Sequence, residues 1–259
     1  MRFIAASFIV AAFLVSLGFA SHKQATMPCT GIVVNIYETH NSVFVDENDI
    51  LQMVQNKFGT LEGKPISSIN ISLLEKIINT NPFISDAEVF STVDGKVVID
   101  VKQRRPLLRV INFKNESFYV DDEGAYMPPS EKYTARVPVA SGYIYEGEIN
   151  KSIVVEMPVT ESDTMKRPVM TQLFNIAKFA TANEFWNAEM QQLYVDINGD
   201  IEMIPRIGGH SVILGDDNNL EEKFKKLLTF YREGLNRRSW DKYKTINLKY
   251  KNQVVCTKK

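Results

Sequence analysis

Residues Asn70–Arg109 read NISLLEKIINTNPFISDAEVFSTVDGKVVIDVKQRRPLLR, and the rest of the chain is organised around this stretch. Apolar side chains recur at helical spacing from Ile71 to Ile78. The pair Asn81-Pro82 ends this helix, because the residue before a proline is pushed out of the helical region. Two β-rich runs follow, and Asp94-Gly95 between them supplies the positive backbone dihedrals of a tight hairpin turn. The stretch therefore predicts a helix that packs on a β-hairpin.

The residues around this stretch complete a small α+β unit. Asp46 or Asn48 can cap the first helix, and Asn70 or Ser72 can cap the second. The expected elements are a strand at Gly31–Tyr37, helices at 49–58 and from Ile71, and strands at 87–91 and 96–102. This order, closed by a basic pair and a proline, resembles a POTRA module and implies a POTRA-like domain over residues 31–106. A generic α+β unit is the alternative for the same pattern.

The composition is that of a globular protein, with 44% apolar and 24% charged residues and a net charge of −1 over 259 residues. Such a balance gives no general attraction to nucleic acid or to anionic lipid. The two cysteines, Cys29 and Cys256, are too few for a disulfide framework and match no zinc-site spacing. They could pair in an oxidising compartment, but two buried thiols are the favoured interpretation.

The segment Phe3–Ala20 carries no charged side chain and follows Arg2. As a helix it would be about 27 Å long, which is close to the thickness of the hydrocarbon core of a bilayer. A cleaved signal peptide is the alternative, although its apolar core is usually shorter. We expect a membrane anchor at residues 3–20, preceded by a minimal cytoplasmic tail of residues 1–2 and followed by a linker of residues 21–30. Either interpretation places the rest of the chain outside the cytoplasm.

A longer, β-rich unit with two or three helices is expected over residues 107–259. Its clearest signal is Asn198-Gly199, a strong hairpin turn between two alternating runs. The proline-bearing run Val137–Gly142 predicts a peripheral strand, since proline is rare in the middle of a sheet. Further strands are expected at 107–113, 117–121, 193–197, 201–204 and 211–214, and helices at 167–182 and 220–233. The predicted fold class is thus α+β, with a transmembrane helix, a POTRA module and a β-rich domain.

The last predicted strand, Thr245–Thr257, has the sharpest alternation in the chain. Apolar residues occupy one face and polar residues the other, namely Ile246, Leu248, Tyr250 and Val254 against Asn247, Lys249, Lys251 and Gln253. A strand that comes last in a chain is often at the edge of its sheet, where free N–H and C=O groups can pair with another chain. An interior strand with one buried face is the alternative.

A single anchor, one POTRA-like module and a β-rich domain ending in a strand together resemble the bacterial cell-division family FtsQ/DivIB. The resemblance covers about residues 30–257, and two features depart from the family. Its members commonly have a longer cytoplasmic tail, and they often carry an acid where this chain has Gln103. The resemblance rests on the order of four short motifs: Gln103-Arg104-Arg105-Pro106, Tyr119–Gly124 with Pro128, Val137–Gly142 and Thr245–Tyr250.

The resemblance implies a non-enzymatic, single-pass type II scaffold of the cell inner membrane at the division septum. Such a scaffold links division proteins through its periplasmic domains and helps regulate septal wall synthesis. Partners of the FtsB/DivIC and FtsL kind are implied, with binding at the last strand. The predicted protein-binding residues are Tyr250, Lys249, Lys251, Gln253, Val254, Val255 and Trp240. An exported POTRA-type binding or chaperone module in envelope assembly is the alternative function.

The sequence predicts no catalytic residue, cofactor site, metal site, nucleic-acid partner or small-molecule substrate. The histidines at positions 22, 40 and 210 are scattered, and none lies beside a nucleophile in a strand-turn-helix setting. The loop Asp196–Asp200 lacks the closing glutamate of a calcium loop and is better interpreted as a hairpin turn. An unrecognised hydrolase is a minor alternative. A basic run around Trp240 is either a solvated turn or a docking surface for an acidic partner helix: Arg232, Arg237, Arg238, Lys242 and Lys244.

Overall fold

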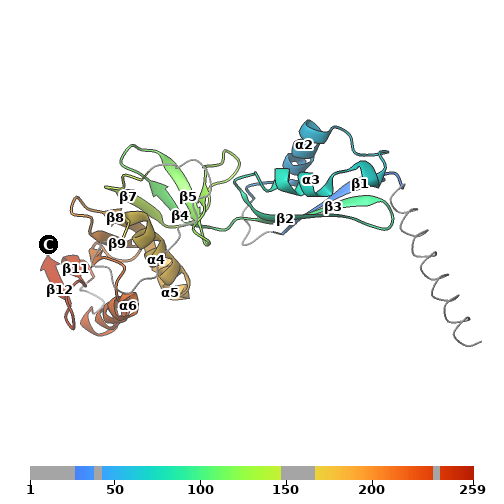
Figure 1. Cartoon of the computed structure of the whole chain (residues 1–259). Coiled ribbons are helices and arrows are strands. Elements are labelled where there is room, and N and C mark those ends of the chain that lie inside the picture. Colours follow the sequence, from blue (N-terminus) through green and yellow to red (C-terminus); the bar gives the residue numbers. More distant parts are fainter. Residues whose placement is uncertain (1–26, 38–42, 147–166, 236–239) are drawn as a thin grey trace, which may run out of the picture. The chain divides into compact units, whose positions relative to one another are not determined.

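The structure is a computed structural model, and the residues it describes are 27–37, 43–146, 167–235 and 240–259 (Figure 1). The chain divides into two compact units, Met1–Arg104 (unit 1) and Arg105–Lys259 (unit 2). The predicted anchor at residues 3–20 and the predicted cytoplasmic tail at residues 1–2 lie outside the described residues. Within the described part, no helix is both long enough and apolar enough to cross a membrane.

Unit 1 has the predicted order of strand, helix, helix, strand and strand. Its elements are β1 (Gly31–Tyr37), α2 (Glu47–Phe58), a 3-10 turn (Ile66–Ser68), α3 (Ile71–Ile78), β2 (Ile84–Ser91) and β3 (Lys96–Gln103). The strands form a sheet of order β1-β3-β2, in which β3 pairs in parallel with β1 and antiparallel with β2. Figure 1 shows α2 and α3 on the same face of this sheet.

Local sequence signals fix the ends of these elements. The Asp46 side chain caps α2 by accepting a hydrogen bond from the backbone N–H of Asp49, and the Asp49 side chain accepts one from Asp46 in return. The Asn70 side chain caps α3 by accepting from the N–H of Leu73. Gly95 has a φ of +83° in the hairpin turn, a conformation that glycine adopts without strain. The structure thus selects Asp46 and Asn70 from the predicted caps and confirms the predicted turn.

The core of unit 1 lies between its helices and its sheet. Ile50 of α2 and Leu74 of α3 are fully buried. The predicted inner face of β3 is fully buried as well, at Val97, Ile99 and Val101. Because side chains alternate along a strand, this face packs beneath the helices while the intervening residues point away.

Unit 2 is built on a nine-stranded sheet of order β12-β11-β10-β9-β8-β7-β4-β5-β6. Its strands are β4 (Pro106–Ile111), β5 (Ser117–Asp121), β6 (Tyr126–Met127), β7 (Val139–Gly142), β8 (Met190–Val195), β9 (Ile201–Pro205), β10 (Ser211–Gly215), β11 (Tyr243–Asn247) and β12 (Val255–Lys258). Its described helices are α4 (Val169–Thr181), α5 (Glu184–Glu189) and α6 (Leu220–Thr229), the last continued by a π-helical turn (Phe230–Gly234). The predicted class, α+β, is confirmed.

The prediction of a peripheral strand at Val137–Gly142 is wrong. Strand β7 lies inside the sheet, where it pairs in parallel with both β4 and β8. Pro138 does not prevent this arrangement, because it precedes the strand and its missing N–H is not needed there. Its carbonyl still accepts a hydrogen bond from the Arg109 N–H at 2.9 Å.

The prediction of one continuous strand over Thr245–Thr257 is also wrong. Two antiparallel strands, β11 and β12, occupy this region, and residues 248–254 form the loop between them. Asn252 in this loop has a φ of +58°, which reverses the chain. An alternating pattern cannot distinguish one long strand from a hairpin whose loop keeps the alternation, which is why the sequence misled here.

The helices of unit 2 cover its sheet and connect its strands. Helix α4 contacts β4, and α5 contacts α4 and β8. The predicted apolar stripe of α4 is fully buried at Leu173, Ile176, Ala177 and Ala180. Helix α6 lies between β10 and β11, which pair in parallel, so it forms the crossover that carries the chain to its last hairpin.

Candidate protein-docking edge

Strand β12 forms one edge of the nine-stranded sheet and pairs with β11 alone among the described strands. The opposite edge is β6, which has only two residues. A short edge strand offers few free backbone groups, whereas a longer one offers a row of them. Of the two edges, β12 is therefore the better template for a strand from another chain.

The backbone of β12 alternates between groups that face β11 and groups that face away from the sheet. The Lys259 N–H donates to the Lys242 carbonyl at 3.2 Å, so Lys259 faces β11. Residues two apart in an antiparallel strand face the same way, which places Thr257 on the same side. The N–H and C=O groups of Cys256 and Lys258 therefore point outward along the free edge.

The loop between β11 and β12 carries Tyr250, which is 51% exposed. Two lysines hold this loop. The ammonium group of Lys226 on α6 donates to the carbonyls of Leu248 at 3.3 Å and Tyr250 at 2.8 Å. The ammonium group of Lys249 pairs with the Asp200 carboxylate at 2.5 Å, and this hydrogen bond raises the pKa of Lys249. The exposed tyrosine thus stands on an anchored loop.

The structure places the other predicted binding residues in different environments. Lys251 and Gln253 are exposed in the same loop, and Val255, at the start of β12, is 43% exposed. Val254 precedes β12, is half-buried and packs against the core. Because Lys249 is already paired with Asp200, its charge is less available to a partner than the sequence suggested.

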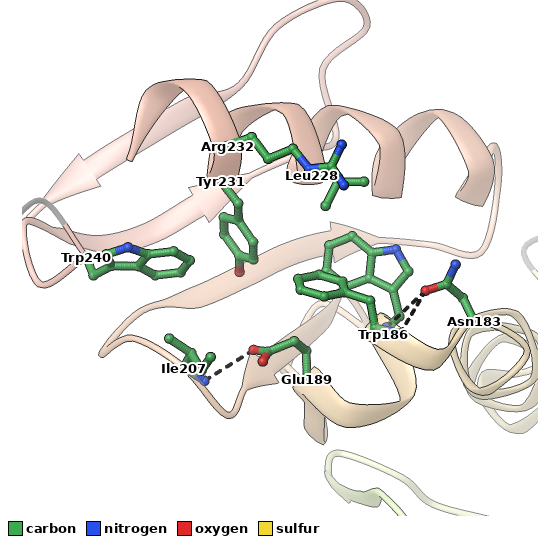
Figure 2. A pocket seen from close by; sticks show the side chains of 9 residues that line it. Asn183, Trp186, Glu189, Ile207, Leu228, Tyr231, Arg232 and Trp240 are labelled. Carbon is green, nitrogen blue, oxygen red and sulfur yellow. Dashed lines mark hydrogen bonds between the residues drawn. The ribbon is translucent and has the colours of Figure 1, made fainter. Parts of the chain in front are cut away.

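Trp240 does not belong to the β11–β12 loop. Its ring packs on Tyr231, with ring centroids 5.0 Å apart, and it lines a pocket of about 390 Å³ (Figure 2). Arg232 lines the same pocket, and Lys242 and Lys244 are exposed. Arg237 and Arg238 lie outside the described residues. Of the basic run, only Arg232 is thereby shown beside Trp240.

His210 is buried, with 4% of its surface exposed. Its Nε2 lies 2.9 Å from the hydroxyl of Tyr231, and its ring stands 6.2 Å from that of Trp240. Burial lowers the pKa of His210, so the neutral imidazole is favoured. These contacts are those of a packed structural histidine.

The Asp196 loop forms the predicted hairpin turn, whereas the prediction of two buried thiols holds for Cys29 and not for Cys256. The Asp196 carboxylate accepts hydrogen bonds from the backbone N–H groups of Asn198 and Asp200, each at 2.8 Å, and so closes a hairpin turn. Within the described residues, no cluster of acidic, histidine and cysteine side chains could hold a metal ion. Cys29 and Cys256 are both free thiols; Cys29 is buried and Cys256 is partly exposed.

Sequence reasoning missed two features of unit 2. Helix α5 has six residues, too few for a helical period to stand out, and it brings Trp186 and Glu189 to the Trp240 pocket. Lys226 is one of three lysines in α6, and only the fold shows that it holds the Tyr250 loop. The Asn183 cap could have revealed α5, since its side chain accepts from the N–H of Trp186.

Comparison with known proteins matches both units. A model of the POTRA-like domain matches residues 27–102, and a model described as FtsQ/DivIB, C-terminal related matches residues 105–257. The chain is also similar to the cell division protein DivIB of Clostridium tetani (strain Massachusetts / E88), with 24% identity over 158 residues, which is 61% of this chain and 56% of that protein. The POTRA-like interpretation of unit 1 and the family resemblance of the chain are confirmed. Because the second match covers more than half of its residues, the chain belongs to the family described as FtsQ/DivIB, C-terminal related.

Proposed function

We propose that this protein is a non-enzymatic scaffold of the bacterial division machinery. Its exported domains link division proteins at the septum and help regulate septal wall synthesis. The family assignment supports this role, and so does the similarity to a protein named as a cell division protein. The alignment spans little more than half of that relative, so the role of the whole chain belongs to the proposal.

The proposed topology is a single-pass type II protein of the inner membrane, with residues 3–20 as a retained anchor. Its support is the uncharged run Phe3–Ala20, which is long for a signal peptide. An alkaline carbonate wash is expected to leave the protein in the membrane pellet with its first residues intact. Recovery of a soluble product that begins near Ser21 would show that the segment is cleaved instead.

The proposed docking site is the free edge of β12 together with the exposed loop that carries Tyr250. The observation that carries this proposal is the position of β12 at the edge, with the backbone groups of Cys256 and Lys258 directed outward. The proposed occupant is an extended segment of a partner of the FtsB/DivIC or FtsL kind. Such a segment adds a strand to the sheet through main-chain hydrogen bonds and buries the ring of Tyr250.

Replacing Tyr250 by alanine tests the docking site. A buried aromatic anchor at an interface contributes about 2 kcal/mol or more, so Tyr250→Ala should weaken partner binding by about thirtyfold. Binding is measured between the full chain in detergent and the exported segment of the FtsB/DivIC-type partner from the same cell. Tyr145→Ala is the matched control, because Tyr145 is 66% exposed in unit 2 and lies away from β12. Equal binding by both variants would place the docking site elsewhere.

A further inference from the structure

The pocket beside Trp240 lies between α5 and the π-helical turn that follows α6. Four aromatic residues line it: Phe185, Trp186, Tyr231 and Trp240. Figure 2 shows Tyr231 between the two tryptophans, and the ring centroids are 6.2 Å apart for Trp186–Tyr231 and 5.0 Å apart for Tyr231–Trp240. The rings meet at interplanar angles of 47° and 52°, so they are tilted and not stacked. This tilted arrangement leaves space between the rings.

One carboxylate shares this aromatic pocket. Glu189, the last residue of α5, is only 6% exposed, and Figure 2 shows its carboxylate turned toward the hydroxyl end of Tyr231. Among the described residues, its carboxylate accepts one hydrogen bond, a long one of 3.3 Å from the Ile207 N–H. Among the described residues, none forms an ion pair with it. Burial and then the Glu189 charge raise the pKa of Tyr231, which keeps that phenol neutral.

A buried carboxylate without a cation is costly, because it has lost most of its hydration and receives little in return. A cation placed in this pocket would pair with Glu189 and at the same time lie against aromatic faces, which attract positive charge. An anionic ligand would be repelled by Glu189, and a neutral apolar ligand would bury the carboxylate further. The chemistry of the lining therefore favours an organic cation.

We propose that this pocket binds a basic side chain, a lysine ammonium or an arginine guanidinium, of the partner polypeptide. This proposal rests on the proposed function, which supplies the partner. The pocket residue Trp240 and the docking strand β12 lie in the same unit and are connected through Lys242. The Lys242 carbonyl pairs with the Lys259 N–H at the end of β12, and Lys242 follows Trp240 by two residues. A partner segment that continues along β12 past Lys258 therefore approaches the stretch of chain that carries Trp240, one of the residues lining this pocket.

Arg232 lies at the other side of the pocket from Glu189 (Figure 2). Its side chain is exposed, so solvent screens its charge more strongly than that of the buried Glu189. The two charges give predictions of opposite sign: removing Glu189 should weaken binding of a cation, and removing Arg232 should strengthen it slightly.

Fluorescence of the full chain in detergent tests the pocket without any partner, because both tryptophans of the chain line it. The probe is N-acetyl-lysine N-methylamide, and the matched control is the norleucine analogue, which keeps the stem and lacks the ammonium. We expect a saturable change with the lysine probe and binding at least about tenfold weaker for the norleucine analogue. Equal binding of the two would overturn the proposal, and so would the absence of any change.

Two variants test the charges. Glu189→Gln keeps the acceptor for the Ile207 N–H and should weaken binding of the lysine probe at least about tenfold. Its unfolding temperature should not fall, because the variant removes a costly buried charge. Arg232→Gln should tighten it about twofold. An unchanged affinity in Glu189→Gln would overturn the proposal, as would weaker binding in Arg232→Gln. The proposal would also be overturned if replacing both Arg237 and Arg238 by glutamine raised the affinity for the lysine probe about tenfold. Such a result would mean that an arginine of the chain itself occupies the site in the parent protein.

Partner binding separates this proposal from the docking edge. Glu189→Gln should weaken the partner by about the same factor as it weakens the lysine probe, while Tyr250→Ala should leave the probe unaffected. If the partner does not bind the parent chain but the lysine probe does, the proposed function fails and the cation site stands. If the partner binds the Glu189→Gln variant as tightly as the parent chain, its basic side chain does not bind in this pocket.

Discussion

The buried side chain of Gln103 forms three hydrogen bonds with the backbone of unit 1. It is 1% exposed, and its amide oxygen accepts hydrogen bonds from the N–H groups of Phe44 at 3.0 Å and Val45 at 3.2 Å. Its amide nitrogen donates to the Val45 carbonyl at 3.2 Å. A carboxylate could accept these two hydrogen bonds but could not donate the third, so a neutral amide fits this position better. Members of the family often carry an acid at the corresponding position.

Replacing Gln103 by leucine should destabilise unit 1 by about 2–3 kcal/mol, because it withdraws the partner of three backbone groups in a buried place. Urea unfolding followed by far-ultraviolet circular dichroism measures the loss; tryptophan fluorescence does not serve, since both tryptophans lie in unit 2. Gln52→Leu, on the exposed side of α2, is the control and should change stability by less than about 0.5 kcal/mol. A loss below about 1 kcal/mol for Gln103→Leu would contradict this account.

Residue roles were harder to predict than residue burial. The inner face of β3 followed from alternation alone, because a strand with one buried face repeats every second residue. The pairing of Lys249 with Asp200 could not be predicted, because the two are far apart in the sequence and meet only when the β11–β12 loop lies beside the β8–β9 hairpin. Tyr250 was placed on the apolar face of a continuous strand with Ile246 and Leu248, whereas the structure places it, exposed, on that loop.

At the scale of the element, the free edge of β12 makes a proline scan informative. The N–H of Cys256 points outward, so Cys256→Pro should remove a hydrogen bond to the partner while the β11–β12 ladder persists. We expect partner binding at least about tenfold weaker and an unchanged far-ultraviolet spectrum. Thr257→Pro, whose N–H faces β11, should instead loosen the hairpin itself.

Cys256→Ala is the matched control for this scan, because it removes the thiol and keeps the N–H. It should bind the partner as the parent chain does. If Cys256→Pro binds normally in a folded protein, main-chain pairing along β12 is not part of the interface.

Elements with a strong local signal were predictable, and elements defined by their neighbours were not. The helix α3, the Asp94-Gly95 turn and the Asn198-Gly199 turn carry their own caps or turn residues. The place of β7 inside the sheet depends on β4 and β8, and a proline in the neighbouring sequence pointed the wrong way. The split of the last strand depends on a loop that no local rule marks strongly.

At the scale of the whole molecule, the order of elements in unit 1 followed from the sequence, while the sheet of unit 2 did not. Unit 1 joins neighbours in sequence, apart from the parallel pairing of β1 with β3. Unit 2 makes its sheet from segments separated by α4, α5 and α6, with three parallel pairings among antiparallel ones. Such pairings connect residues far apart in the chain, and no short stretch specifies them.

The position of β12 in the sequence has a consequence for the folding of the chain during its synthesis. A ribosome makes a chain from its N-terminus, and segments fold in roughly that order. Strand β12 follows every other described strand of its sheet in the sequence, and among these strands it pairs with β11 alone. An unfinished chain can therefore assemble most of the sheet and still lack the strand proposed for recognition. In this way the position of one edge strand would let a partner recognise chains whose synthesis has passed β12 and ignore those cut short before it.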